Sequence, residues 1–294
     1  MCRLFGMSAG PQRVHATFWL LEASNSLAQQ SHREPDGTGL GTYDPDGRPI
    51  VSKQPLAAYE DQEFARAARS IASNTFVAHV RYASTGSLTP ENTHPFEQRD
   101  RLFAHNGVIE QIDRLERELG EAMSLVQGET DSERFFALIT REVDRCGGDV
   151  TAGIVAASRW VAENLPVLAV NLVLISGSEL WALRYPETHE LYVLERAAGG
   201  PAGTRRLSHS SSRRRIKVQS SDLAGLPAVV IASEPMDEDP GWRLLDSGEL
   251  VHVDFELSVD SRRVLDAPPA HQLTLADLDP RARSSQRPLT QAQP

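Results

Sequence analysis

The second residue of the chain is a cysteine, in the opening run Met1-Cys2-Arg3, and this position gives its thiol a particular chemical option. Removal of the initiator methionine would leave a free α-amine on the same residue. A peptide α-amine has a pKa of about 7.7 to 8.0, so its neutral form can accept the proton of a thiol with a pKa of about 8.5. Cys2 would then be a nucleophile that carries its own general base. An ordinary small residue at the start of a strand also fits this position.

The dipeptide Asn106-Gly107 offers the two hydrogen-bond donors that a tetrahedral oxyanion needs, should Cys2 attack an amide carbonyl. Asn106 contributes a side-chain N–H2 group and Gly107 a backbone N–H. A glycine also allows the backbone to approach a ligand closely. Asn-Gly is a common hairpin turn as well, so the dipeptide alone leaves a purely structural role open.

Two charged residues are suited to holding an amino acid by its two ends. Arg81 follows an apolar strand pattern, and its planar guanidinium can bind a carboxylate through two parallel hydrogen bonds or form a structural ion pair. Asp131 can bind an ammonium group. Because Thr130 and Glu133 flank it in the spacing of a capping box, Asp131 also fits a helix N-terminus that binds nothing.

His94 and His105 are candidates for general bases or metal ligands, and we assign neither role to them. No two histidines stand four residues apart and no Cys-x-x-Cys occurs, so zinc spacing is absent and we expect no metal and no cofactor. We expect both to be buried histidines that bond to their neighbours and support the site.

The elements that position these residues follow from the apolar periodicity. Strands are predicted at 2–8, 38–43, 76–82 and 101–105, and helices at 15–30, 60–73, 130–145 and 150–164. Further strands are predicted at 168–176, 179–185, 191–195, 228–232 and 250–255, and a surface loop at 197–212. This order favours an α+β layered architecture with mostly antiparallel sheets.

Composition and charge limit the class of protein. With 294 residues, 40% of them hydrophobic, the chain can bury a large core. A net charge of -10 opposes a nucleic-acid or membrane surface. No signal peptide pattern and no apolar run of about 18 residues is present, so we expect a cytoplasmic protein. We predict one domain over 1–260 and a polar, disordered tail over 261–294.

The second cysteine, Cys146, lies in helical register with Phe135 and Val143. We therefore predict a small apolar contact on a buried helix face. Two cysteines give no disulfide framework and suit a reducing compartment.

Four ordered motifs accompany Cys2 and carry a family resemblance. They are His-x-Arg-Tyr-Ala-Ser at 79–84, Asn-Thr-His-Pro-Phe at 92–96, His-Asn-Gly at 105–107 and Glu-Thr-Asp-Ser-Glu at 129–133. The chain resembles the class II glutamine amidotransferases, whose glutaminase domain has the N-terminal-nucleophile (Ntn) hydrolase fold. The resemblance covers roughly residues 2–255. It implies a four-layer αββα sandwich, a layer order that periodicity does not provide.

The resemblance also implies a role for each site residue. Cys2 would be the nucleophile, with its α-amine as base, and Asn106 with Gly107 would form the oxyanion hole. Arg81 would bind the α-carboxylate of glutamine, while Asp131 and the Gly107 backbone would bind its α-ammonium.

The motif at 79–84 departs from the family pattern at two positions. Tyr82 and Ser84 stand where many members have Trp and Thr. Both changes are conservative, and Ser84 keeps a hydroxyl for substrate binding.

The chain leaves no room for the synthase domain that many members carry, because only about 40 residues, rich in Pro, Arg and Gln, follow position 255. It therefore resembles stand-alone members, including those of ergothioneine biosynthesis and glutathione breakdown. Either it feeds ammonia from glutamine to a separate synthase subunit, or it hydrolyses a larger γ-glutamyl compound. A non-catalytic glutamine-binding regulatory protein is the alternative from another class. We expect the loops at 32–36 and 84–94 to set the specificity.

Overall fold

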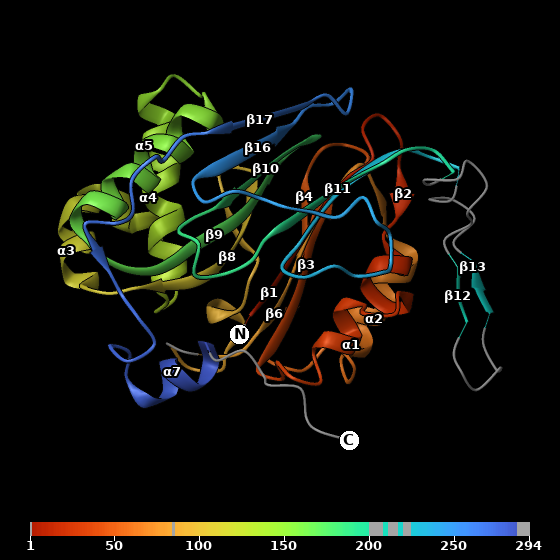
Figure 1. Ribbon diagram of the computed structural model, residues 1–294, viewed down its shortest axis with the longest axis horizontal. Helices are drawn as coiled ribbons and strands as arrows, with labels where there is room; N and C mark the ends of the chain where they lie inside the picture. Colours follow the sequence, from red (N-terminus) through yellow and green to blue (C-terminus); the bar gives the residue numbers. More distant parts are fainter. Residues whose placement is uncertain (1, 84–85, 200–207, 211–216, 220–224, 287–294) are drawn as a thin grey trace.

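The computed structural model describes residues 2–83, 86–199, 208–210, 217–219 and 225–286, and two large β-sheets form its centre (Figure 1). The first sheet has the spatial order β15 (Arg243–Leu244), β11 (Tyr192–Arg196), β14 (Ala228–Ala232), β1 (Arg3–Ser8), β6 (Thr75–Arg81), β3 (Gly37–Tyr43) and β4 (Pro49–Gln54). The second has the order β17 (Val259–Arg263), β16 (Glu249–Val253), β10 (Glu179–Arg184), β9 (Pro166–Ser176), β8 (Arg101–Ile109) and β7 (Phe96–Gln98). These neighbours are antiparallel, whereas β18 (His271–Gln272) joins β9 in parallel.

Helices cover the outer face of each sheet (Figure 1). Beside the first sheet lie the π-helix η1 (Phe18–Glu22), α1 (Leu27–Gln30) and α2 (Gln62–Ser70). Beside the second lie α3 (Ile112–Leu119), the 3-10 helix η3 (Gly120–Leu125), α4 (Asp131–Arg145) and α5 (Val150–Asn164). The smaller elements are β2 (Val14–His15) with β5 (Ala72–Ser73), β12 (Ser208–Ser210) with β13 (Lys217–Gln219), the 3-10 helix η2 (Pro90–Asn92) and α7 (Pro280–Gln286).

Alternating side chains of the strands fill three apolar layers. In β1, Leu4 packs between the sheets while Phe5 packs against the helices of the first sheet. In β8, Leu102 faces the other sheet and Phe103 faces α4. Because successive side chains of a strand point to opposite faces, each sheet is apolar on both sides and needs a cover on both. The four-layer αββα architecture is therefore confirmed.

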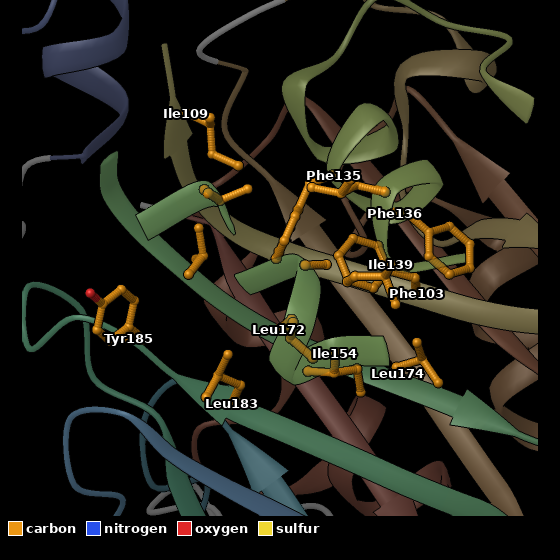
Figure 2. Packing of buried hydrophobic residues seen from close by; sticks show 14 of the residues in the cluster. Phe103, Ile109, Phe135, Phe136, Ile139, Ile154, Leu172, Leu174, Leu183 and Tyr185 are labelled. Atoms are coloured by element: carbon orange, nitrogen blue, oxygen red, sulfur yellow. The ribbon is translucent and has the colours of Figure 1, made fainter. Parts of the chain in front are cut away.

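Aromatic packing joins α4 to the second sheet. The rings of Phe103 and Phe136 stack with their centroids 4.7 Å apart and their planes 7° apart. Figure 2 shows Ile139, Ile154 and Leu172 filling the space around them between the helices and the sheet. This core holds α4 in place, and the first residue of α4 belongs to the candidate site.

The helix predicted at 15–30 is wrong as a single element. It is divided into β2, η1 and α1, and the break falls at a polar run. Asn25 bonds to the backbone of residues 235 and 236, with its N–H 3.1 Å from the Met236 oxygen. Ser26 then caps the next helix by accepting the N–H of Gln29. These tertiary contacts replace the bonds of a continuous helix.

The predicted disordered tail is also wrong for residues 261–286, which include β18 and α7. Leu278 and Ala282 are buried against Val108 and Leu168 of the second sheet. The abundance of Pro, Arg and Gln in this segment concealed the spaced apolar residues that fix it. Residues 287–294 lie outside the described residues.

Cys146 does not make the buried contact that its register predicts. It is the exposed C-cap of α4, because the chain leaves the helix at Gly147 and Gly148, with φ angles of 68° and 97°. Most of the predicted loop at 197–212 lies outside the described residues. In the part of the chain that the structure describes, no helix has the length and apolarity to cross a membrane.

Candidate active site

Cys2 lies at the start of the central strand of the first sheet. Strand β1 is flanked by β6, with Arg3 opposite Val80, so Cys2 lies beside the end of β6. The Cys2 Sγ accepts the N–H of Tyr82 at 3.3 Å and lies 3.4 Å from its carbonyl oxygen. The residue is 9% exposed. Burial raises the pKa of the Cys2 thiol, so its sulfur is protonated near neutral pH and needs a base to become nucleophilic.

An ion-pair network fixes the backbone at Cys2. The Arg3 Nη1 atom donates to the Cys2 carbonyl at 3.3 Å and lies 3.8 Å from the carboxylate of Glu34, whose side chain is 1% exposed. The Nε atom of Arg3 pairs with Glu234 at 3.0 Å, and Arg33 pairs with the same carboxylate at 2.6 Å. Sequence reasoning missed this network because its partners are far apart along the chain.

Asn106 and Gly107 lie within β8 and not in a hairpin turn, since they pair with Asn171 and Val170 of β9. Asn106 is 1% exposed, and its Oδ1 has no hydrogen-bond partner among the described residues. A Cβ atom on Gly107 would lie 1.7 Å from the carbonyl oxygen of Ala169. Only glycine therefore fits at position 107.

The N-terminus of α4 meets the end of β8. The Asp131 Oδ2 accepts the backbone N–H of Ile109 at 2.9 Å. Gly107 and Asp131 line the same cavity. The predicted cap is present, with Thr130 Oγ1 accepting the Glu133 N–H at 3.2 Å. Asp131 thus begins a helix and also lines the cavity.

Arg81 ends β6 and is 4% exposed. Its Nη1 donates to the carbonyl oxygen of Ser87 at 3.2 Å. Burial lowers its pKa, and the neighbouring Cys2 and Asp36 oppose that shift. The Ser87 N–H and hydroxyl both donate to the carboxylate of Glu129. These bonds connect the loop that contains Ser87 to the start of α4.

Two histidines, His94 and His105, line the candidate site, and His79 packs against His94. Nδ1 of His105 lies 2.9 Å from the Ser132 hydroxyl, as expected for a buried histidine bonded to its neighbour. His94 instead packs against His79, with the ring centroids 4.2 Å apart and the planes tilted by 41°, and neither of its ring nitrogens has a described hydrogen-bond partner. Burial lowers the pKa of all three rings, that of His79 to about 3. They are therefore neutral near pH 7 and poorly suited to act as bases.

One small cavity collects most of the predicted residues. Its lining consists of Cys2, Arg81, His94, His105, Gly107 and Asp131, together with Tyr82, Thr130 and Ser132. Asn106 adjoins this lining through Gly107 and does not itself contribute to it. Ser84 lies outside the described residues. Tyr82 belongs to the motif at 79–84, and Thr130 and Ser132 belong to the motif at 129–133, so these motifs were the signal that could have identified them as part of the lining.

The arrangement surrounds a thiol with charged groups of both signs. A cationic and an anionic group, Arg81 and Asp131, border the same cavity as a thiol. Within the described residues, no three His, Cys, Asp or Glu side chains are placed to hold a metal ion.

Comparisons with known proteins identify similar sequences. The family model of the class II glutamine amidotransferases matches residues 1–263. An uncharacterized protein of Methanocaldococcus jannaschii is 30% identical over 282 residues, which cover 90% of this chain and 73% of that protein. The gamma-glutamyl-hercynylcysteine sulfoxide hydrolase of Mycolicibacterium smegmatis is 29% identical, with 80% of this chain and 85% of that protein covered.

A solved structure supports the fold. The allosteric regulatory enzyme of purine biosynthesis superposes with a TM-score of 0.63 at 21% identity, over 91% of this chain. The chain spans 50% of the length of that neighbour.

Proposed function

Because the chain belongs to the class II glutamine amidotransferases, a family of enzymes, we propose that it hydrolyses the γ-amide bond of glutamine or of a larger γ-glutamyl compound. The shared cavity is the observation that carries the proposal. It brings the thiol of Cys2 together with Arg81 and Asp131, groups that suit the carboxylate and ammonium of a glutamyl unit.

The first half of the reaction forms a thioester. The α-amine of Cys2 removes the thiol proton, and the sulfur attacks the γ-carbonyl carbon of the substrate. Negative charge develops on the carbonyl oxygen, where the Asn106 side chain and the Gly107 N–H donate to it. The leaving nitrogen takes a proton from the α-amine of Cys2, which is now protonated, and the carbon–nitrogen bond breaks.

The second half releases glutamate. A water molecule gives a proton to the α-amine and its oxygen attacks the thioester carbon, which forms a carbon–oxygen bond. The carbon–sulfur bond then breaks, and the Cys2 sulfur recovers a proton from the protonated α-amine of the same residue. The products are glutamate and ammonia or an amine.

Replacing Arg81 with lysine should raise the KM for glutamine about 10- to 100-fold with a smaller change in kcat. Lysine keeps the charge and loses the planar pair of donors that a buried carboxylate needs. Steady-state release of glutamate measures this effect.

A substrate without the carboxylate supplies the control for Arg81. The penalty should disappear for 4-aminobutanamide, which is glutamine without its α-carboxylate, when ammonia release is measured. An equal penalty on both substrates would assign Arg81 a structural role.

The more specific form of the proposal is that the substrate is a γ-glutamyl compound larger than glutamine. It is favoured by the similarity to the mycobacterial hydrolase, whose name specifies a γ-glutamyl compound and which this chain matches over most of both lengths. The other form is a glutaminase that supplies ammonia to a separate synthase subunit. Arg81 and Asp131 would hold the γ-glutamyl half in the same way in both forms.

Glutamate release from a panel of substrates tests the proposal. The panel contains glutamine, γ-glutamyl amides and γ-glutamyl peptides, and intact mass first confirms that Cys2 is the N-terminal residue. We expect release, with a higher kcat/KM for a larger γ-glutamyl compound. Preference for glutamine would support the synthase-coupled form. Binding without release from any substrate would refute hydrolysis and favour a glutamine-binding regulatory protein.

A further inference from the structure

The hydroxyl of Ser132 lines the candidate site and contacts a histidine. Ser132 is the second residue of α4, directly after Asp131, and it is 6% exposed. Its Oγ lies 2.9 Å from Nδ1 of His105, and both residues belong to the lining of the cavity that contains Cys2. The proton between these two atoms belongs to one of them, and its position decides whether the hydroxyl offers the cavity a donor or an acceptor.

The second hydrogen bond of His105 fixes the position of that proton. Its Nε2 lies 3.3 Å from the carbonyl oxygen of Ala169 in β9, and because a carbonyl oxygen can only accept, Nε2 carries a proton. His105 is buried, and burial lowers the pKa of its ring, so the ring is neutral near pH 7 and Nδ1 has no proton. The Ser132 hydroxyl therefore donates to Nδ1.

A hydroxyl that donates its only proton in this way offers lone pairs to any other neighbour. Within the part of the chain that the structure describes, no group donates to the Ser132 oxygen. The hydrogen bonds from Ser132 through His105 to Ala169 thus make the Ser132 oxygen an acceptor at the wall of the cavity. A ligand N–H can bind there, and a second acceptor cannot.

The α-ammonium of a γ-glutamyl unit has three N–H groups, and it needs an acceptor for each when it is buried. In the proposed function, on which this inference rests, Asp131 binds this ammonium. The Oδ2 atom of Asp131 already accepts the N–H of Ile109. Ser132 is the next residue of the helix and lines the same cavity, so its oxygen is an acceptor beside the one that Asp131 provides.

We propose that Ser132 Oγ accepts a hydrogen bond from the α-ammonium of the substrate, and that His105 is the positioning residue that keeps the hydroxyl proton turned away from it. The pair selects substrates that carry an α-amine. No covalent step involves either residue, so their contribution is to binding.

Two amides that differ only in the α-amine test the proposal. Glutamine carries this group, and glutaramate, its deamino analogue, does not. Ser132→Ala should raise the KM for glutamine about 5- to 50-fold and change kcat less than about twofold, because the hydrogen bond to the ammonium is lost from ground state and transition state alike. The KM for glutaramate should change less than about twofold.

Steady-state release of ammonia measures both amides. Where glutaramate is turned over slowly, its inhibition constant against the preferred substrate gives the same comparison.

Hydroxyl and position have separate controls. Ser132→Thr keeps the hydroxyl and should hold the KM for glutamine within about threefold of wild type. Ser158 is a buried serine of α5 outside the cavity lining, and its hydroxyl has no hydrogen-bond partner among the described residues. Ser158→Ala should therefore leave both amides unchanged. Thermal unfolding of each variant shows that it is folded.

A double-mutant cycle tests the part of His105. His105→Gln keeps an amide donor for the Ala169 carbonyl and removes the Nδ1 acceptor, so the Ser132 hydroxyl can rotate. The KM for glutamine should rise, and Ser132→Ala should then raise it by a smaller factor than in the wild-type protein. Independent, multiplicative effects of the two substitutions would overturn the positioning role of His105.

The remaining outcomes separate this inference from the function beneath it. Equal effects of Ser132→Ala on glutamine and glutaramate, or a wild-type KM for glutamine in that variant, would overturn the role of Ser132 and leave hydrolysis intact. Failure of the wild-type protein to release ammonia from glutamine or an amine from any γ-glutamyl compound would overturn both.

Discussion

Replacing Cys2 with alanine is expected to lower kcat about 10⁴-fold or more, because no thioester can form without the sulfur atom. Binding of glutamine should persist, since the groups that hold its charged ends remain. Glutamate release and calorimetric binding, on protein whose N-terminus has been confirmed by mass, measure the two effects separately. Wild-type turnover by the purified variant would place the nucleophile elsewhere.

The chain provides a matched control for this experiment. Cys146 is the other cysteine, and it is exposed at the end of α4. Cys146→Ala should therefore leave kcat and KM within about twofold of wild type, as is usual for exposed positions. A loss of activity in both variants would indicate a general effect of thiol removal and not a catalytic role of Cys2.

Replacing Asn106 with alanine is expected to lower kcat about 10²- to 10³-fold and leave KM nearly unchanged. The side-chain N–H2 group of Asn106 acts mainly when negative charge has developed on the carbonyl oxygen, so its loss raises the barrier and not the dissociation constant. The side chain is buried, so the thermal unfolding of the variant must be followed as well.

Asn74 offers the control for removal of an amide. It precedes β6 at the end away from Arg81, where its Nδ2 donates to the carbonyl of Gly10 at 2.8 Å. Asn74→Ala should lose stability without a large change in kcat. An increase of KM alone in Asn106→Ala would instead make Asn106 a binding group, and would leave Gly107 as the only proposed donor to the oxyanion.

The candidate site residues could be proposed from the sequence because each has a local chemical feature and because the motifs that contain them carry a family resemblance. A cysteine at position 2, an arginine at a strand end and a capped aspartate are each visible in a few letters. Their relation to one another is not, because it depends on long-range pairing. Asn106-Gly107 has the same letters in a turn and in a strand, and only the pairing with Asn171 and Val170 of β9 decides between them.

The misread segments have a common physical cause. The helix predicted at 15–30 is interrupted by bonds from Asn25 to residues 235 and 236, more than two hundred positions away. Residues 261–286 form regular elements, and Leu278 and Ala282 of this segment contact the second sheet. In each case local propensity competes with tertiary contacts, and the tertiary contacts prevail.

The position of β1 has a consequence for how the protein is made. This strand lies between β6 and β14, and Phe5 pairs with both Ala78 and Ala232. A ribosome that adds about 5 to 20 residues per second needs roughly 10 to 45 s to proceed from β1 to β14. Until then one edge of β1 has no neighbour, and the first residues of the nascent chain remain accessible. Synthesis thus leaves time for methionine removal before the sheet closes around Cys2.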